Sequence, residues 1–479
     1  MKLDTTWRLP PESFLPSPVL RDIPVENLSA RLEAALERLG APAKVVRTVA
    51  GPTTVAFELR PAANVKMNDF TRLRRADDLA FALSAEGVRI QAPIPGKQLV
   101  GIEIPSPARR VVELSELLPV TEAPLTAGIG ITPGLSKLAL DIAELPHLLV
   151  AGATGSGKSS LLHTIICSLL MKSTPDELQL VLVDLKRTEL SRYAGVPHLR
   201  GKPVDDSDKA MIALQALVRE VERREGLLAK LGVQNIDEYN ALAEEPLPRV
   251  LCVVDEFAEL MLTARKDVET DVVRLGQLGR ACGVHLLLAT QSPHRQVFSG
   301  LIKANIPVRI ALRVASGTHS RVALDQGGAE QLLGNGDALL LDGPTPRRFQ
   351  AAYVTADVIA QIVEHWKEQK PEELAPIGPP VTPASVRPPT PPAPRRSRRS
   401  GLGVLIGLLA LGALYVAFSA APSPGGCPNG TAYENTSLEE VCSTTSGKVK
   451  CDISAYGYSP NRRRGPDGPW CKNAHGWKE

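Results

Sequence analysis

The sequence predicts an α/β protein whose main domain holds a parallel β-sheet, with a smaller α+β domain before it. The chain has 479 residues, more than the roughly 250–300 that one hydrophobic core usually serves. Four fully apolar runs are typical of strands covered on both faces, and helical stretches alternate with them. The predicted strands are His147–Ala151, Leu178–Val183, Val250–Val254 and His285–Ala289, and the predicted helices are Lys158–Met171, Lys209–Lys230 and Val268–Cys282.

Bulk composition indicates a folded chain but says little about its partners. Hydrophobic residues make up 43% and charged residues 22% of the sequence, which is near the average for soluble globular proteins. The formal net charge is only +3, and residues 371–400 alone carry five Arg against two Glu. Any nucleic-acid partner must therefore be argued from motifs rather than from bulk charge.

The first hundred residues predict the small domain. Leucines recur at helical spacing in Val25–Gly40, and Gly40 is placed to end that helix. We expect an N-terminal arm at 1–22 and the small α+β domain at 23–115. The arm lacks a secretory signal pattern, so this side of the chain is expected in the cytosol. Strands are predicted at Lys44–Val49, Thr53–Leu59, Val88–Ala92 and Leu99–Ile104, with a helical stretch at Met67–Ser84.

The strongest motif is a phosphate-binding loop between a predicted strand and a predicted helix. It fills every position of the pattern G-x-x-x-x-G-K-S. Its glycines let the backbone wrap round a triphosphate, the lysine reaches the β and γ phosphates, and the first serine after it supplies a hydroxyl to Mg²⁺. The residues predicted to bind ATP are Gly152, Ala153, Thr154, Gly155, Ser156, Gly157, Lys158, Ser159 and Ser160.

Two acids and one amide follow later strands and complete the predicted site. Asp255 and Glu256 end the run Val250–Val254, and Gln291 ends the next strand. Asp255 is expected to bind Mg²⁺ together with Ser159, and Glu256 to polarise the attacking water. Gln291 is placed to sense the γ phosphate.

These motifs, in their order, resemble the motor of the FtsK/SpoIIIE family of DNA translocases. The chain also carries GVHLLLATQSP at 283–293, GLIKANIPVRIALRV at 300–314 and SRVALDQGGAEQLLGNGDALL at 320–340. GPTTVAFELRP and IPGKQLVGIEIP resemble the small domain that precedes the motor in that family. The resemblance implies a RecA-like P-loop ATPase at 116–370, assembled as a homohexameric ring that moves double-stranded DNA. One departure is Asp184-Leu185-Lys186, where the family usually has a proline after the aspartate.

The resemblance also suggests an arginine that reaches the neighbouring subunit's nucleotide, because the charge of the transition state needs a cation. Arg280 is the first candidate for this catalytic role and Arg321 the second. Arg295 and Lys303, after Gln291, are candidates for contact with DNA phosphates.

The last hundred residues fall outside that resemblance. Residues 371–400 hold ten prolines and end in four arginines, which predicts an extended linker. Residues 401–421 carry no charge and would span about 30 Å as a helix, enough to cross a bilayer. The arginines before this transmembrane segment place the motor in the cytoplasm and the tail outside.

The seven cysteines form two groups. Cys167, Cys252 and Cys282 lie in apolar stretches and are expected to be buried and reduced. The tail at 422–479 holds four, Cys427, Cys442, Cys451 and Cys471, which suits an extracytoplasmic domain with two disulfides. Three pairings are possible, and the sequence does not choose among them.

Three functions remain open at this point. The first is a membrane-tethered DNA translocase for DNA transfer, segregation or genome packaging. The second is a secretion-system ATPase that moves protein. The third is a membrane-tethered nucleotide switch whose tail binds a partner.

Overall fold

The computed structural model describes residues 7–18, 26–72, 76–94, 96–118, 123 and 125–369, together with strands at 432–436, 439–444 and 472–473. The chain divides into two units, residues 1–385 and 386–479, and each is described by itself.

The small domain is an antiparallel sheet covered by helices. The strand order is β1-β2-β4-β3, and the predicted alternation of strands and helices is confirmed. Its core is formed by apolar residues of the sheet and of α1 and α3, among them Leu36, Phe57, Leu79 and Ile102. The elements are α1 (Glu26–Arg38), β1 (Ala43–Ala50), β2 (Thr54–Pro61), α2 (Met67–Arg72), α3 (Ala76–Leu83), β3 (Arg89–Gln91) and β4 (Val100–Pro105).

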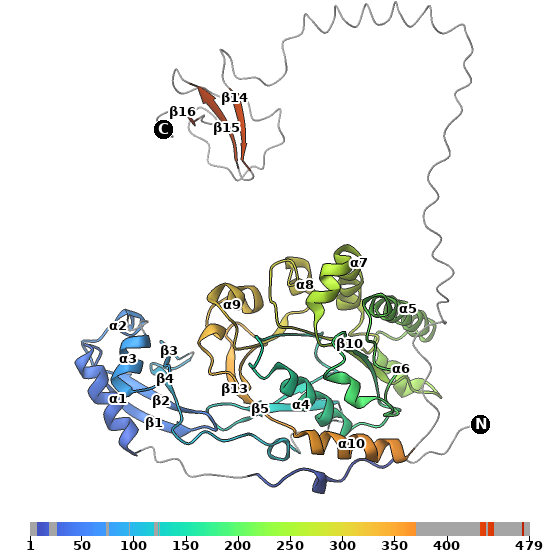
Figure 1. Ribbon diagram of the computed structural model, residues 1–479, viewed down its shortest axis with the longest axis horizontal. Coiled ribbons are helices and arrows are strands. Elements are labelled where there is room, and N and C mark those ends of the chain that lie inside the picture. Colours follow the sequence, from blue (N-terminus) through green and yellow to red (C-terminus); the bar gives the residue numbers. More distant parts are fainter. Residues whose placement is uncertain are drawn as a thin grey trace, which may run out of the picture. The chain divides into compact units, whose positions relative to one another are not determined.

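The main domain is built on a nine-stranded sheet (Figure 1). Each of the four apolar runs predicted as strands forms one, and all four lie in its parallel part. The strands in sheet order are β6 (Lys137–Asp141), β5 (Thr126–Ile131), β13 (Arg347–Ala351), β12 (Asp337–Leu341), β11 (Val308–Leu312), β7 (Leu148–Ala151), β10 (Val284–Thr290), β9 (Arg249–Val254) and β8 (Leu178–Val183).

The prediction of a parallel sheet holds for only five of these strands. β8, β9, β10, β7 and β11 are parallel, whereas β12, β13, β5 and β6 add to the sheet in antiparallel fashion. The reason lies in the connections, because β5–β6 and β12–β13 are joined by loops too short for the crossover that parallel neighbours require.

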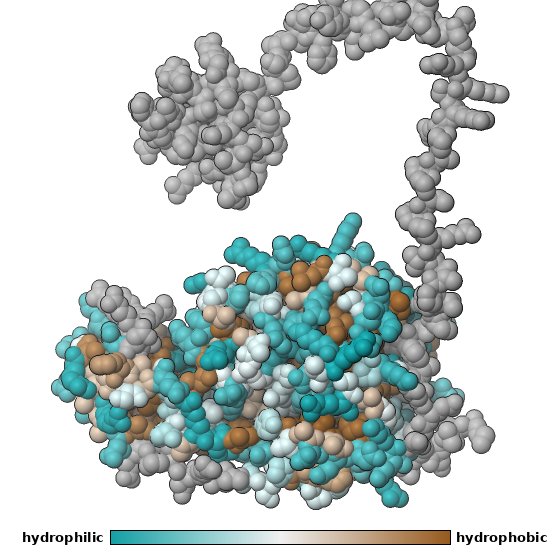
Figure 2. All heavy atoms as spheres, viewed as in Figure 1, coloured by the Kyte–Doolittle hydropathy of each residue, from teal (hydrophilic) through white to brown (hydrophobic). Residues whose placement is uncertain are grey.

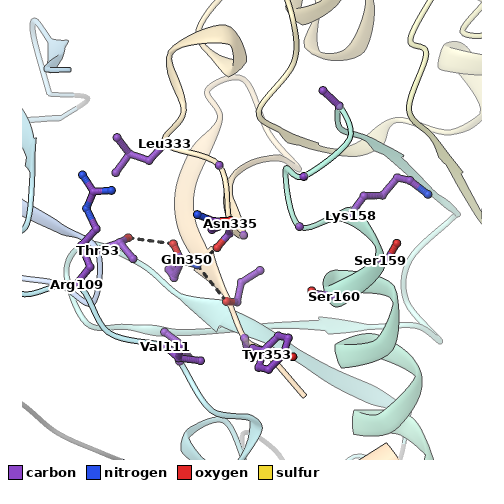
Figure 3. Close-up of a pocket in the computed structure, with 18 of the residues that line it drawn as sticks. Thr53, Arg109, Val111, Lys158, Ser159, Ser160, Leu333, Asn335, Gln350 and Tyr353 are labelled. Carbon is purple, nitrogen blue, oxygen red and sulfur yellow. Dashed lines mark hydrogen bonds between the residues drawn. The ribbon is translucent and has the colours of Figure 1, made fainter. Parts of the chain in front are cut away.

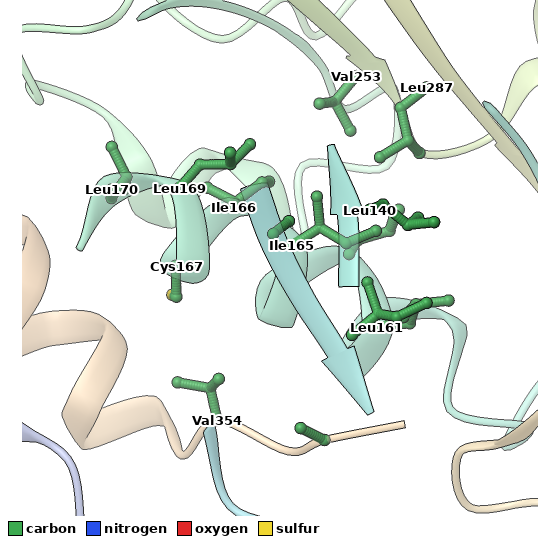
Figure 4. Packing of buried hydrophobic residues seen from close by; sticks show 14 of the residues in the cluster. Leu140, Leu161, Ile165, Ile166, Cys167, Leu169, Leu170, Val253, Leu287 and Val354 are labelled. Carbon is green, nitrogen blue, oxygen red and sulfur yellow. The ribbon is translucent and has the colours of Figure 1, made fainter. Parts of the chain in front are cut away.

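Helices cover both faces of this sheet. On one face α4 (Lys158–Leu170) and α10 (Ala356–Glu368) share a core with β5, part of which is seen in Figure 4. On the other face α5 (Ser207–Leu231) and α7 (Phe257–Leu278) pack together. The remaining helices are α6 (Ile236–Leu242), α8 (Gly300–Asn305) and α9 (Gly317–Leu324), and single 3-10 turns occur at Glu12–Phe14, Leu114–Glu116, Leu190–Tyr193 and Ala329–Gln331.

One predicted helix is corrected by the structure. The sequence predicted a helix over Val268–Cys282, but α7 begins at Phe257, directly after Glu256, and ends at Leu278. A non-helical residue at Ala264 (φ −145°) interrupts it, so the helix does not keep one apolar periodicity along its whole length. Glu256 therefore precedes the first turn of a long helix and does not lie in a loop.

The three cysteines of the main domain are buried free thiols, as predicted. Burial raises the pKa of Cys167 and Cys252 to about 12 and that of Cys282 to about 11. Thiols with such pKa values carry almost no thiolate at neutral pH and act as small apolar side chains.

The N-terminal arm runs along α10. The Trp7 ring meets the Trp366 ring edge-on, with 6.0 Å between centroids, and Trp7 Nε1 donates to Asp176 Oδ2 at 2.9 Å. Trp366 is fully buried, stacks edge-on with His198 at 4.5 Å, and donates from Nε1 to the carbonyl of Leu170 at the end of α4. The arm thus fixes the last helix of the domain.

The second unit contains a three-stranded sheet in the order β14-β15-β16, formed by β14 (Ala432–Thr436), β15 (Glu439–Thr444) and β16 (Lys472–Asn473). β15 carries Cys442 opposite Tyr433. The predicted linker and the predicted span at 401–421 lie outside the described residues. Within the residues that are described, none of the helices has the length and apolarity needed to cross a bilayer.

Candidate nucleotide site

The phosphate loop lies at the carboxyl edge of the parallel strands, between β7 and α4. Three neighbouring segments hold its backbone: Gly152 N donates to Thr290 O at 3.1 Å, Ala153 N donates to Arg313 O at 2.8 Å, and Gly336 N donates to Ser156 O at 2.8 Å. The loop is therefore fixed by the ends of β10 and β11 and by the segment before β12.

Two glycines of the loop adopt conformations that other residues rarely reach. Gly155 has a φ of +75°, and Gly157, which precedes the first turn of α4, has a φ of +101°. A Cβ at Gly157 would lie 2.5 Å from Gly336 N. The sequence pattern thus places glycine where both the left-handed backbone and the close approach of a second chain segment demand it.

Lys158 and Asp255 form a buried ion pair. Lys158 Nζ donates to the Asp255 carboxylate and, at 2.7 Å, to the Asp255 carbonyl. Each side chain is only 3% exposed. The two groups that the sequence assigned to phosphate and metal lie together at this edge and neutralise each other.

The Glu256 carboxylate is surrounded by donors. Thr290 Oγ1 donates to it at 2.6 Å, the backbone N–H of Gln291 at 3.2 Å, and Lys186 Nζ at 3.2 Å. Glu256 is 5% exposed. Neither Thr290 nor Lys186 was expected from the sequence to take part in the site.

Gln291 contacts the phosphate loop directly. Thr154 Oγ1 donates to Gln291 Oε1 at 2.8 Å. The predicted sensor residue is therefore linked on one side to the loop and, through its backbone N–H, to Glu256 on the other.

A cavity of about 710 Å³ opens beside the phosphate loop (Figure 3). Its phosphate end is lined by residues 153–155 and 157–160 and by Gln291. Its far end is lined by residues from four other segments, none of which was predicted to contact the nucleotide: Thr53, Arg109, Val111, Leu333, Asn335 and Tyr353.

The small domain is tied to this cavity by hydrogen bonds. Thr53 Oγ1 donates to Gln350 Oε1 at 3.0 Å, and Gln350 Nε2 donates to Asn335 O at 2.8 Å (Figure 3). Buried Arg348 extends the connection, since it donates to Asp337 in β12 and to Glu103 in β4.

The residues present fit a nucleoside triphosphate with a divalent metal ion. Loop residues 153–155 and 157–160 line the cavity, and the half-buried Ser159 hydroxyl lies beside it. Asp255 supplies a carboxylate oxygen, the ligand type that Mg²⁺ prefers.

The two candidate arginines lie at different places. Arg280 precedes β10, at the amino edge of the parallel strands and so on the edge opposite the phosphate loop, where it pairs with Glu144 at 2.8 Å. Arg321 lies in the last turn of α9 and is exposed. Action in trans by either arginine stays a prediction.

Arg295 and Lys303, the candidate DNA contacts, line one surface cavity together with Arg321. Lys303 is paired with Asp325, which also accepts from Arg309. The structure thus brings together three cations that the sequence singled out separately.

The fold and this edge of the sheet define a P-loop ATPase of the α/β class. Residues 122–295 match the model of the FtsK/SpoIIIE family, and residues 19–106 match the model of the FtsK alpha domain. With its small domain and its motor, the chain belongs to the FtsK/SpoIIIE family.

Relatives and one solved structure agree with this assignment. The DNA translocase FtsK of Streptococcus pyogenes serotype M3 (strain SSI-1) is 44% identical over 354 residues, 71% of this chain and 44% of that protein. The DNA translocase SpoIIIE of Bacillus subtilis (strain 168) is 42% identical over 367 residues, 72% of this chain and 46% of that protein. The chain thus spans less than half the length of these relatives. The pCW3 conjugation coupling protein TcpA, in its monomer form with ATPγS, is 26% identical with a TM-score of 0.51, covering 72% of this chain and 100% of that one.

Proposed function

We propose that this protein is an ATP-driven translocase of double-stranded DNA that works as a homohexameric ring tethered to a membrane. The observation that carries the ATPase part is the meeting of Lys158, Asp255, Glu256 and Gln291 at one edge of the sheet, beside a cavity lined by the glycine loop.

In this proposal each residue at the edge has one task. The loop N–H groups and Lys158 bind the phosphates, while Ser159 and Asp255 hold Mg²⁺, which neutralises phosphate charge when it is bound. Glu256 accepts the proton of the attacking water. Because Lys158 and Asp255 pair in the described structure, binding of the nucleotide and the metal replaces their mutual contact.

DNA as the substrate is supported by the names of the relatives, which are DNA translocases at 42% and 44% identity. The cavity lined by Arg295, Lys303 and Arg321 offers cations to a phosphate backbone. Of these, Lys303 is partly neutralised by Asp325, so Arg295 and Arg321 are the stronger contributors.

The membrane tether rests on the sequence alone. Residues 401–421 are uncharged and preceded by arginines, which supports a single span with the motor in the cytoplasm and residues 422–479 outside. Deleting residues 395–479 should leave ATPase activity in solution nearly unchanged and abolish sedimentation with membranes. Membrane association that survives this deletion would contradict the tether.

The decisive experiment measures ATP hydrolysis by the full chain with and without duplex DNA. A translocase is expected to hydrolyse ATP faster with duplex DNA. Stimulation by a protein substrate instead of DNA would favour a secretion ATPase. Nucleotide binding with negligible turnover in every condition would favour a switch.

A further inference from the structure

Lys186 has no role in the proposed chemistry, yet its ammonium group lies beside the residue on which that chemistry depends. Lys186 Nζ is 3.2 Å from Glu256 Oε2 and 3.8 Å from Glu259 Oε1. Its side chain is 39% exposed, whereas that of Glu256 is only 6% exposed. The lysine thus reaches from the surface toward a nearly buried carboxylate.

The local structure accounts for this placement. β8 ends at Val183, and the next residue, buried Asp184, accepts hydrogen bonds from the backbone N–H groups of residues 188–191. This forces an immediate turn, in which Arg187 takes a left-handed φ of +56°. The turn holds Lys186 at the carboxyl edge of β8, next to the end of β9.

The charges around Glu256 show why a cation is needed there. Asp255 is already neutralised by Lys158, so Lys158 is not available to Glu256. Glu259, in the first turn of α7, adds a second negative charge near Lys186. Thr290 and the Gln291 N–H donate hydrogen bonds to the carboxylate but carry no charge. Among the described residues, Lys186 is the cation that contacts this carboxylate.

We propose that Lys186 is a positioning residue for Glu256: its ammonium group compensates the buried carboxylate and, with Thr290, fixes the oxygens that receive the proton of water. An ionised carboxylate with no partner in such a site is costly, and removing one member of a buried pair leaves the other uncompensated. This inference rests on the proposed ATPase function, but the ion pair itself does not.

The test compares two substitutions in the full chain. Lys186→Met keeps an unbranched side chain only one heavy atom shorter and removes the charge, and Lys186→Arg keeps the charge. Lys186→Met is expected to lower kcat for ATP roughly ten- to hundredfold, no more than the lower end of the roughly 10²–10⁴-fold that a general base contributes, because Glu256 itself is kept. The Kd for ATP should change by less than about twofold. Lys186→Arg should restore most of kcat.

The neighbouring residue supplies a matched control. Arg187 is 68% exposed and pairs with Asp205 at 2.9 Å, not with Glu256, so Arg187→Gln should behave like the wild type. A wild-type or raised kcat in Lys186→Met, or an Arg variant as inactive as the Met variant, would overturn the proposal. If Lys186→Met does not fold, Lys186→Gln takes its place.

A second measurement separates this inference from the proposed function. If the wild-type chain hydrolyses no ATP, the proposed function fails, but the ion pair can still be measured by thermal unfolding of Lys186→Met, Glu256→Gln and the double variant. Non-additive effects are expected from a contacting pair. Additive effects would refute the role of Lys186 even in an active enzyme.

Discussion

At the residue scale, the site holds three nearly buried charged side chains, Lys158, Asp255 and Glu256, and all three have partners. Lys158 and Asp255 neutralise each other, and Glu256 lies among Thr290, Gln291 and Lys186. Because charges in low-dielectric surroundings interact strongly, single substitutions here should separate binding from hydrolysis.

Lys158→Ala should abolish ATP hydrolysis because it removes the cation at the β and γ phosphates, and it should weaken ATP binding by at least about tenfold. Glu256→Gln should keep ATP binding while lowering kcat by roughly a hundredfold or more. Titration with a fluorescent ATP analogue measures binding, and phosphate release measures turnover. Normal turnover in either variant would show that the substituted residue is not needed for ATP hydrolysis.

Three buried histidines predict a loss of stability in mild acid. Burial lowers the pKa of His147 and His198 to about 4, and burial together with the nearby His147 lowers that of His285 to about 3. In the unfolded chain the pKa of a histidine is about 6.5. Between that pH and the lower pKa of the folded state, the unfolded chain therefore binds more protons than the folded protein. Their contribution to stability is therefore full above pH 6.5 and falls as the pH drops toward 4.

Denaturant unfolding between pH 7.5 and 5 measures this effect. Each histidine should contribute a slope of up to about 1.4 kcal/mol per pH unit below 6.5. His198→Asn should make the slope shallower. A free energy of unfolding that stays constant over this range would contradict the burial of neutral imidazoles.

The residue scale also shows where sequence reasoning stops. Lys158, Asp255, Glu256 and Gln291 were found because each follows an apolar strand or sits in a motif. Lys186 is 70 residues from Glu256, and only the pairing of β8 with β9 brings them together. No local sequence pattern predicts a contact between residues so far apart in the chain.

At the element scale, the segment before β12 supports the phosphate loop from behind. Gly336 donates its N–H to Ser156 O at 2.8 Å and has a φ of +90°. A Cβ added there would lie 2.8 Å from Gln350 Nε2. Position 336 thus requires glycine for two reasons: its φ is positive, and a Cβ there would clash with the side chain of Gln350.

Gly336→Ala should disturb the loop and raise the Kd for ATP by roughly tenfold, the equivalent of about 1–2 kcal/mol of backbone strain. Gly343 lies in the hairpin between β12 and β13 with nothing within 4 Å of an added Cβ, and Gly343→Ala is the control. Equal affinities in the two variants would show that the segment before β12 does not support the loop.

Elements differed in how well the sequence predicted them. β7, β8, β9 and β10 were found because buried parallel strands are continuous apolar runs. The antiparallel half was missed, because its strands depend on pairing such as Gln350 with Ile131, which joins segments far apart in the chain. The far end of the nucleotide cavity was missed for the same reason.

At the scale of the whole molecule, a buried ion network joins the small domain to the motor. Burial alone would raise the pKa of Glu103, but Arg89 and Arg348 lower it below its ordinary value. Arg348 also makes two bonds to Asp337. On the face seen in Figure 2, hydrophilic residues predominate and hydrophobic residues lie in separate groups among them.

Assembly of a ring can be tested by mixing subunits. If Arg280 acts in trans, Arg280→Ala and Glu256→Gln chains should each be inactive, and mixtures should recover part of the activity, because some interfaces regain both groups. ATP turnover across mixing ratios measures this. Full activity of Arg280→Ala alone, with no recovery in mixtures, would point to Arg321 or to no such arginine.

The packing of Trp366 has a mechanical consequence. The described part of the main domain ends one turn after this residue, which Trp7 and His198 enclose and which bonds the carbonyl of Leu170. A force that pulls on the chain beyond residue 369 would therefore act first on Trp366 and its contacts. The hydrogen bond to Leu170 transmits this force to the C-terminal end of α4. That end lies about 20 Å, the length of the 13-residue helix, from the end that follows the phosphate loop. In the proposed tethered motor, such a load would act on the end of α4 that lies away from the phosphate loop.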